Sequence, residues 1–584
     1  MQHSILRARA VRAVLIGLSA FMLAACGGSD TTPVTGVQIR PLSPEFMTRK
    51  AVAYSPYRTA VNAAGLDAEV IPPANIKQDL DLVLAAGFRQ IRLFGSDDKV
   101  ARQTLQVIVD NNMNLRVQLG AFIQGDTFAA AADKPAIYAA NEASIARVVA
   151  LANNPTFKPL VLAVSIGNET QVDFSGVRTK PETLAGYLRK VRSQIEQPVT
   201  TDDNVFAWAA MPVQITNEID FASIHTYPQL DTFFNPTLFN WRQKDVPEAE
   251  RAQAMMNAVI AEAKRQYGLA RSYLDSKGLS GMPITVGETG WNVIDPRLPF
   301  LAHPVNQKMY LDALAAWADE GRTGAGPKAV FYFEAFDEPW KLGDDGWGLF
   351  NKQRQARYAI QAINANNSPA GSATWVYAPG TFLPTSALYF KPAVVKPALT
   401  ESNYVIYTDA APGTSEFRPV NLFWDAFDGN TAIAPEVTSK FAPGDATRSI
   451  EITPQPASFG WGFLRQPHDT GDTDNLSGYA STGRLNFWIS TTYPGKIEIG
   501  ISTDTQDRLA QEAYLQLQPG NFGYCNTGAW CQVSIPLSDF IAKNPKLDLS
   551  LVLARFIIAD VYARTGNAPG STAKLNIDGI YWSR

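Results

Sequence analysis

The strongest constraint on the fold is a regular alternation of short β-branched runs with longer amphipathic segments between about residues 45 and 363. Such runs predict strands, and apolar residues recurring every three to four positions predict helices. Helices are expected over a segment that Asn75 caps and Gly87 ends, and over residues 137–153, 182–195, 248–276 and 305–320. Eight strands are predicted between them, at Ala51–Tyr54, Gln90–Phe94, Leu115–Leu119, Val161–Ile166, Pro198–Thr201, Phe221–His225, Ile284–Val286 and Ala329–Phe333.

Strands that alternate with helices indicate an α/β protein with a parallel sheet, and eight of them in this order predict a closed (β/α)₈ barrel. An open, doubly wound sheet is the alternative. That fold would favour a Gly-rich nucleotide turn after the first strand or a phosphate-binding loop, and neither motif occurs. The barrel is therefore the preferred prediction for residues 45–363.

The C-terminal part of the chain has a different pattern. Residues 405–584 contain short alternating strands, such as those at 485–489, 496–501 and 575–581, separated by Gly, Pro, Asn and Asp turns. This pattern predicts an antiparallel β-sandwich of the jelly-roll kind. Residues 364–404, rich in Ala, Pro, Ser and Thr, are expected to link the two domains.

The N-terminal segment has the composition of an export signal. Arg7, Arg9 and Arg12 precede an apolar run that ends in Leu23-Ala24-Ala25-Cys26-Gly27. Small residues before a Cys resemble the lipobox of bacterial lipoproteins. We therefore expect a signal peptide over residues 1–25, a lipidated Cys26, a tether over 26–44, and a membrane-anchored protein of the bacterial cell envelope, in the outer membrane or periplasm. An ordinary cleaved signal with an incidental Cys is the alternative.

Cysteine, histidine and charge counts restrict cofactors and partners. The chain has 51 basic and 55 acidic residues, so it lacks the basic excess that nucleic-acid binding requires. With three Cys and four His, a zinc site built from several His or Cys ligands is not expected. No cofactor is predicted. Cys525 and Cys531 are expected to form a disulfide bond, with two unpaired thiols as the alternative. Asp425, Asp428 and Asp578 could supply oxygen ligands for structural calcium, although acidic turn residues are commoner than calcium sites.

Two glutamates follow predicted strands at the end of the barrel where reactive groups lie. Glu169 follows the fourth strand and Glu288 the seventh, and strands three positions apart can face each other across the barrel. Two carboxyl groups roughly 5 Å apart form the pair of a retaining glycosidase. Glutamates in structural salt bridges or helix caps are the alternative.

Further polar and aromatic residues are expected at the same end of the barrel. Asn168 could donate a hydrogen bond to a sugar 2-hydroxyl, and Trp291 could pack against a pyranose ring or belong to the core. Tyr227 could orient the nucleophile or pack in the core. The remaining candidates are Tyr54, Tyr57, His225 and Trp347. Asp202 and Asp203 are expected to cap loops rather than bind ligand, and Glu334 and Asp337 are expected at most to donate or accept sugar hydrogen bonds.

Three segments together resemble glycoside hydrolase family 17, the β-1,3-glucanases and related glucanosyltransferases. They are Gly167-Asn168-Glu169, the segment Val286 to Trp291, and the segment Phe331 to Lys341; residues 53–57 and 91–94 fit the same pattern. The resemblance implies a β-glucan substrate, retention of configuration, Glu169 as acid/base and Glu288 as nucleophile. It also implies substrate binding by Glu338, Trp340 and Lys341.

The predicted sandwich resembles, loosely, carbohydrate-binding modules. Its aromatic residues would either bind glycan or form a core, and they are Phe423, Trp424, Phe427, Trp461, Phe463, Trp488 and Trp530. The leading hypothesis is a lipid-anchored, retaining β-1,3-glucanase or transglycosylase. The alternatives are a retaining barrel enzyme for another β-glycan and a non-catalytic glycan-binding lipoprotein.

Overall fold

The computed structural model describes residues 38–584 except 174, 231–242, 244, 295–300, 342–345, 362, 364–392, 409–414, 428–430, 439, 446, 455–458, 468–471, 505–509 and 569. The predicted signal peptide, Cys26, most of the tether and most of the linker lie outside the described residues. The chain divides into two compact units on either side of residues 389 and 390. Each unit is described by itself below.

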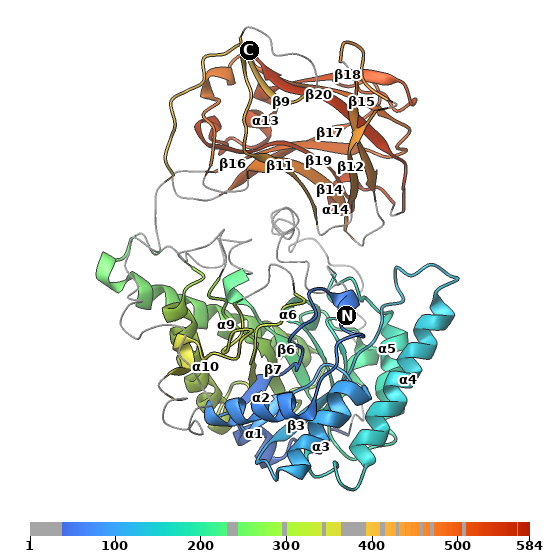
Figure 1. The fold of residues 1–584 in the computed structure, drawn as a ribbon, viewed down its shortest axis with the longest axis vertical. Helices are drawn as coiled ribbons and strands as arrows, with labels where there is room; N and C mark the ends of the chain where they lie inside the picture. The colour runs from blue at the N-terminus through green and yellow to red at the C-terminus, as the bar shows by residue number, and fades with distance from the viewer. Residues whose placement is uncertain are drawn as a thin grey trace. The chain divides into compact units, whose positions relative to one another are not determined.

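The first unit is a closed barrel of eight parallel strands in sequential order, which confirms the predicted fold (Figure 1). The strands are β1 (Ala51–Ala53), β2 (Gln90–Arg92), β3 (Arg116–Ala121), β4 (Val161–Asn168), β5 (Val199–Asn204), β6 (Ala222–His225), β7 (Ile284–Thr289) and β8 (Val330–Tyr332). Pairing of β1 with β8 closes the barrel, with Ala51 opposite Phe331. A closed barrel has no free sheet edge, so the carboxyl ends of all eight strands converge at one mouth.

Helices surround the strands in Figure 1. The longer ones are α2 (Pro73–Ala85), α3 (Gln103–Asp110), α4 (Lys134–Asn153), α5 (Pro181–Arg192), α9 (Arg251–Ser276) and α10 (Pro304–Thr323), with shorter α1 (Pro44–Thr48), α6 (Val205–Trp208) and α7 (Val213–Thr216). The start of α2 differs from the prediction, because Pro72 and not Asn75 is its N-cap. Pro73 presets the helical φ in the first turn. Gly87 follows the helix with φ 86°, a left-handed conformation typical of a helix end.

Four strands end later in the chain than the sequence predicts, and they are β3, β4, β5 and β7. β5 runs to Asn204 and β7 to Thr289, so Asp202, Asp203 and Glu288 lie within strands and not in the loops after them. Acidic residues are uncommon inside strands because a buried carboxylate requires partners. The partners lie on neighbouring strands, and they form the site described below.

The second unit is a sandwich of two β-sheets, as predicted. One sheet contains β10 (Glu416–Phe417), β9 (Asn403–Tyr407), β20 (Leu575–Ser583), β13 (Ser449–Pro454), β12 (Thr431–Val437), β15 (Arg484–Thr491) and β18 (Trp530–Pro536). The other has the order β11 (Leu422–Ala426), β14 (Gly460–Pro467), β19 (Val552–Val561), β16 (Ile497–Thr503) and β17 (Gln511–Leu517). All these pairs are antiparallel except β9 with β10.

Alternate residues of the two sheets fill the sandwich core. On β15, for example, Leu485, Phe487 and Ile489 are fully buried against residues of the facing sheet such as Phe556. This alternation with a period of two is the pattern from which the strands were predicted. The sandwich therefore has its own hydrophobic core.

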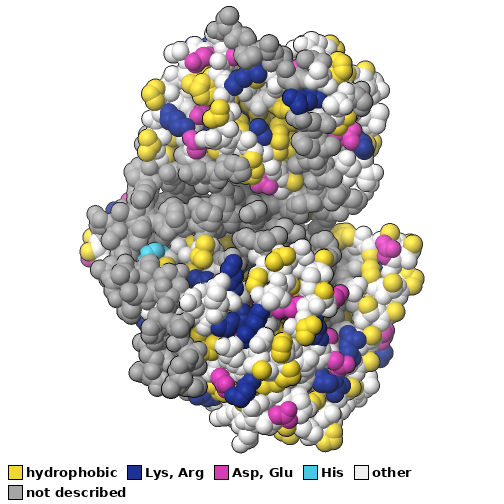
Figure 2. Space-filling view, in the orientation of Figure 1, with side chains coloured by type: hydrophobic (Ala, Val, Ile, Leu, Met, Phe, Trp, Pro, Cys, Tyr) yellow, Lys and Arg dark blue, Asp and Glu magenta, His cyan; other side chains and the backbone are white. Residues whose placement is uncertain are grey.

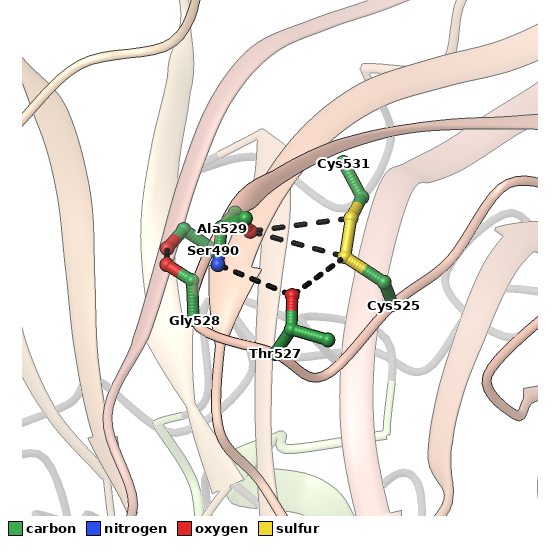
Figure 3. The surroundings of a disulfide bond; sticks show 6 residues. All are labelled: Ser490, Cys525, Thr527, Gly528, Ala529 and Cys531. Carbon is green, nitrogen blue, oxygen red and sulfur yellow. Dashed lines mark hydrogen bonds between the residues drawn. A yellow bond between two sulfur atoms is a disulfide. The ribbon is translucent and has the colours of Figure 1, made fainter.

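A disulfide bond joins Cys525 and Cys531 just before and within β18 (Figure 3). It closes a short loop in which Gly528 adopts φ 82°. The Ser490 hydroxyl donates a hydrogen bond to the Gly528 carbonyl at 2.6 Å, and the Gly528 N–H donates to Thr491 at 2.8 Å. The loop is thus attached to β15 as well as closed by the disulfide.

The face shown in Figure 2 mixes Lys and Arg with Asp and Glu side chains over the described residues. This distribution agrees with the near balance of basic and acidic residues in the sequence. Among the described residues, no helix has both the length and the hydrophobicity needed to cross a bilayer.

Candidate active site

Glu169 directly follows β4 in an unusual backbone conformation. Its φ is 49°, and Gly167 two residues earlier has φ 83°. Positive φ is disfavoured for a residue with a Cβ and persists where neighbouring contacts fix it. The Glu169 N–H donates to the Asp202 carbonyl of β5 at 2.8 Å, and this bond holds the turn against the adjacent strand.

Glu288 lies on β7, with Gly287 before it. A Cβ at position 287 would overlap the Ser223 hydroxyl and lie 2.6 Å from Asp202 Oδ1. Only glycine fits here, because the side chains of β5 and β6 occupy the space beneath the strand. This close approach places the backbone of β7 directly over the Asp202 carboxylate.

His225, at the end of β6, faces both glutamates. Its Nδ1 is 3.2 Å from Glu169 Oε1, and its Nε2 is 3.8 Å from Glu288 Oε2. The two carboxylates therefore converge on opposite nitrogens of one fully buried imidazole. Burial, the largest influence, lowers the pKa of His225, but the Glu288 charge and the hydrogen bond to Glu169 outweigh it and raise the pKa above its ordinary value.

Arg92, at the end of β2, connects the two halves of the site. Its Nη1 donates to Glu288 Oε2 at 2.9 Å and to the Gly287 carbonyl at 3.0 Å. Its Nη2 donates to Asn168 Oδ1 and lies 2.9 Å from Asp202 Oδ2. The side chain is 1% exposed, so its charge acts in a medium that screens it weakly. Arg92 therefore gives Glu288 a buried counter-ion and a charge-assisted hydrogen bond that holds one of its oxygens in place.

Tyr227 provides the second hydrogen bond to Glu288. Its hydroxyl donates to Oε1 at 2.6 Å, while Arg92 occupies Oε2. Burial and the Glu288 charge raise the pKa of Tyr227 well above its ordinary value, so the hydroxyl remains a donor. The ring packs edge-on against Trp347 at 5.4 Å and Phe333 at 6.3 Å, and these contacts fix its orientation.

The Glu338 and Lys341 pair of the last motif is buried. Lys341 Nζ is 2.5 Å from Glu338 and 3.3 Å from Glu334, and it lies 4.4 Å from the centre of the Phe333 ring. Burial raises the pKa of Glu334 well above its ordinary value. Burial also acts to raise the pKa of Glu338, but Lys341 outweighs it and lowers that pKa. Trp340 is buried too, and its Nε1 donates to Glu338 at 2.9 Å.

Asp202 and Asp203 have separate sets of partners. Asp202 accepts hydrogen bonds from Ser165 at 2.5 Å and from Ser223, in addition to its contact with Arg92. Asp203 accepts three backbone N–H bonds, two of them from the loop after Glu169, so it caps that loop from within β5. The loop-cap prediction is wrong for Asp202, because the partners given above are side chains that face it inside the barrel. Asp337 is likewise engaged in structure, by Arg357 and the N–H groups of residues 346 and 348.

Two predicted sugar-binding residues need correction. Trp291 is fully buried, donates from Nε1 to the Leu301 carbonyl at 2.9 Å and packs against Tyr310, so its ring belongs to the core. Tyr54 is 1% exposed, and its hydroxyl donates to Asp79, which is paired with Arg354. Neither side chain has a face open to a sugar. Tyr57 is also buried, with Lys99 over its ring at 5.5 Å.

The sandwich residues divide into two groups. Phe427, Trp461 and Phe463 are buried and form core, which is one of the two alternatives left open by the sequence, while Phe423, Trp424, Trp488 and Trp530 remain partly exposed. Asp578 accepts N–H bonds from Ala442 and Gly579, as turn-capping carboxylates do, and Asp428 lies outside the described residues. Within the part of the chain that the structure describes, no three His, Cys, Asp or Glu side chains are arranged to hold a metal ion.

Comparison with known protein families bears directly on this barrel. The model of the BtgE/BtgC glycoside hydrolase domain matches residues 51–349, just over half of the chain. The chain belongs to the BtgE/BtgC glycoside hydrolase family. A second model, carbohydrate binding domain 30, matches residues 404–578 and covers the sandwich.

Two curated relatives are similar to parts of this family member. A putative glucan endo-1,3-beta-glucosidase btgC from Aspergillus niger is 25% identical over 313 residues, 50% of this chain and 40% of the relative. A glucan 1,3-beta-glucosidase from Arthroderma benhamiae is 24% identical over 224 residues, 35% of this chain and 62% of the relative. The chain thus spans less than two thirds of the length of each.

Solved structures resemble each unit. An endo-laminarinase from Formosa is 22% identical with a TM-score of 0.48, covering 56% of this chain and 88% of the laminarinase. A family 30 carbohydrate-binding module from Clostridium thermocellum is 21% identical with a TM-score of 0.25, covering 31% of this chain and 96% of the module.

Sequence reasoning missed Arg92 as a site residue. It appeared only within a strand segment that fits the family pattern. An arginine inside a strand that is otherwise apolar is a usable signal, because a buried guanidinium requires carboxylate or carbonyl partners. Those partners, Glu288, Asn168 and Asp202, come from three other strands.

Proposed function

We propose that this BtgE/BtgC family member is a retaining glycoside hydrolase that cleaves β-1,3-glucan by double displacement. The observation that carries the proposal is the convergence of Glu169 and Glu288 on the two nitrogens of His225 at the mouth of the barrel. The β-1,3-glucan specificity is supported by the family 17 motifs and by the names of the two curated relatives, both of which are glucan 1,3-beta-glucosidases.

In the first step, Glu288 attacks the anomeric carbon. Arg92 and Tyr227 each donate to one of its carboxylate oxygens and so orient the group for attack. Glu169 gives its proton to the departing glycosidic oxygen. Asn168 has its carbonyl oxygen engaged by Arg92, which leaves its amino group as the end that donates to a sugar 2-hydroxyl.

In the second step, the glycosyl–enzyme bond is broken. The negative charge of Glu288 is lost in the covalent intermediate, and Glu169, now deprotonated, removes a proton from the incoming acceptor. Water as acceptor completes hydrolysis, whereas a sugar hydroxyl completes transfer. A time course of laminari-oligosaccharides resolved by size distinguishes the two, because products longer than the input require transfer.

The Glu288→Gln variant tests the nucleophile. Turnover of laminarin should fall by about 10⁴-fold or more, while binding of laminari-oligosaccharides is retained, because the amide keeps the shape but cannot attack carbon. Glu142→Gln, on the exposed surface of α4, is the matched control and should retain wild-type turnover. Unchanged turnover of Glu288→Gln would reject the assignment.

The linkage is tested separately on polymers. The wild-type protein should release products from laminarin and not from β-1,6-glucan or β-mannan. If only another polymer is cleaved, the barrel is a retaining enzyme for that glycan. If no polymer is cleaved but laminarin is bound, the protein is a glycan-binding lipoprotein that keeps the barrel as a scaffold.

We also propose that the sandwich holds glucan chains. Trp488 on β15 and Trp530 on the adjacent β18 are partly exposed, and flat aromatic faces suit pyranose rings. With alanine at both positions in the Glu288→Gln background, laminarin in the gel should slow the protein less in affinity electrophoresis than it slows the Glu288→Gln protein. Equal mobility shifts would argue for a structural or docking role.

The N-terminal motif supports a further proposal, that Cys26 is lipidated and anchors the protein in the bacterial cell envelope. The small residues before Cys26 and the basic, apolar segment preceding them carry this proposal. Cys26→Ala should move the protein from the membrane fraction to the soluble fraction and abolish incorporation of labelled fatty acid. Unchanged labelling would refute it.

A further inference from the structure

β5 ends in two consecutive aspartates whose side chains reach different parts of the site. Asp202 contacts Arg92 inside the barrel, whereas Asp203 contacts the loop that follows Glu169. Asp203 Oδ2 accepts the Gln171 N–H at 2.7 Å. Its Oδ1 accepts the N–H of Val172 at 3.3 Å and of Asn204 at 2.8 Å. Successive side chains of a strand point to opposite faces, which explains the different partners of the two residues.

These bonds fix a turn that would otherwise be unfavourable. Glu169 has φ 49°, and its own N–H is bonded to the Asp202 carbonyl at 2.8 Å. The bonds from Gln171 and Val172 to Asp203 follow within three residues. β5 therefore holds the backbone both at and directly after Glu169, and the orientation of the Glu169 side chain depends on these attachments.

Asp203 also places a second carboxyl group in the surroundings of Glu169. It is fully buried, and the ionisable groups that act on it are Glu169 from β4 and His225 from β6. Burial and the Glu169 charge raise the pKa of Asp203 to about 7, against the stabilising effect of its N–H bonds. Two carboxyl groups that interact in this way bind protons as a pair.

We propose that Asp203 is a positioning residue that holds the backbone of the acid/base Glu169 and, through its charge, extends the pH range over which Glu169 keeps its proton. The inference rests on the proposed function of Glu169. The mechanism above does not use Asp203, because its oxygens are occupied by backbone N–H groups.

Asp203→Asn is the most direct test. An amide presents one acceptor oxygen and one amino group, so either Gln171 or the Val172 and Asn204 pair would face a donor. We expect kcat/KM on laminari-oligosaccharides to fall by about 10- to 100-fold. The alkaline limb of the kcat/KM profile should move about one unit to lower pH, because a negative charge near Glu169 has been removed.

An activated substrate separates positioning of the acid from general damage. An aryl β-laminaribioside with a strongly acidic phenol as leaving group departs without protonation, so Asp203→Asn should approach wild-type kcat/KM on it. Asp203→Ser, whose hydroxyl replaces only part of the acceptor set, is a second neutral variant and should show the same selectivity if Asp203→Asn folds poorly.

Asp220→Asn is the matched control. Asp220 is also fully buried and accepts a backbone N–H, that of Val199, at 2.8 Å, but at the opposite end of β5. The Asp220→Asn variant should have a lower thermal unfolding midpoint, but the alkaline limb of its kcat/KM profile should not move. Equal losses of Asp203→Asn on both substrates with an unshifted limb would overturn the inference. If the wild-type protein itself turned over neither substrate, the proposed function would be overturned instead.

Discussion

Removal of the Arg92 guanidinium provides the most demanding test of the site. Arg92 lies between the carboxylates of Glu288 and Asp202, each 2.9 Å from a guanidinium nitrogen. Arg92→Met keeps much of the side-chain volume but leaves two buried carboxylates without their cation. Breaking a buried ion pair from one side costs about 3–5 kcal/mol of unfolding free energy. For a domain of this size we expect the unfolding midpoint to fall by about 5–8 °C.

The effect on catalysis follows from the same charge. A unit positive charge about 4 Å from Glu288 contributes about 4 kcal/mol at an effective dielectric constant of 20. Without it, Glu288 loses its buried counter-ion and the donor that orients its Oε2, so turnover should fall by about 10²- to 10³-fold. Arg92→Lys keeps the charge but not the forked donors, and it should retain more turnover than the methionine variant.

Unfolding monitored by circular dichroism and laminarin kinetics measure the two effects. In a double-mutant cycle, the loss of unfolding free energy in Arg92→Met/Asp202→Asn should be smaller by about 2 kcal/mol than the sum of the losses in the two single variants. The reason is that the second substitution removes one of the uncompensated charges. Arg354→Met, which breaks the buried pair with Asp79, is the control for stability and should leave the turnover of the folded protein near that of the wild type. Additive losses within about 0.5 kcal/mol, together with unchanged turnover of Arg92→Met, would refute the reasoning.

Two further predictions concern His225 and the disulfide bond. Because the pKa of His225 is raised in the folded state, its contribution to stability is complete below about pH 6.5 and is lost as the pH rises through the raised value. The difference in urea midpoint between the wild type and His225→Asn should therefore narrow from pH 5.5 to 8.5. A difference that stays constant over this pH range would contradict the prediction. Replacing Cys525 and Cys531 by Ser opens a loop whose ends are separated by 6 in sequence, and this should lower the unfolding free energy of the sandwich by about 2 kcal/mol. The kcat on soluble laminari-oligosaccharides should not change. Reduction of the wild-type protein by dithiothreitol should reproduce the loss of stability, and an unchanged unfolding midpoint would show that other contacts hold the loop.

The hydrophobic pattern was sufficient for the architecture. All eight barrel strands and the change to antiparallel strands after residue 400 could be predicted, because strand and helix periods differ and the buried runs are long enough to show them. The ends of β5 and β7 could not. From the sequence alone, Asp202 and Glu288 are predicted to lie in loops after their strands. Only the donors on other strands, above all Arg92, make these carboxylates compatible with a buried strand.

The candidate site shows the same division. Strand ends identified Glu169 and Glu288, since polar residues after barrel strands meet at one mouth. Aromatic residues were harder to assign, because a tryptophan three residues after a glutamate is equally compatible with the core and with the cleft. Trp291 and Tyr54 are core in the structure, and their burial depends on residues such as Tyr310 and Asp79 that are distant in sequence.

The contacts of Arg92 make the active site a property of the complete barrel. Its partners come from β4, β5 and β7, so four strands must be in register before Glu288 acquires its counter-ion. A fragment or circular permutant that formed only part of the cylinder would therefore be inactive even with both glutamates present. Residual enzymatic rate during denaturant titration should thus report cooperative collapse of the whole barrel, with no folded but inert species preceding it.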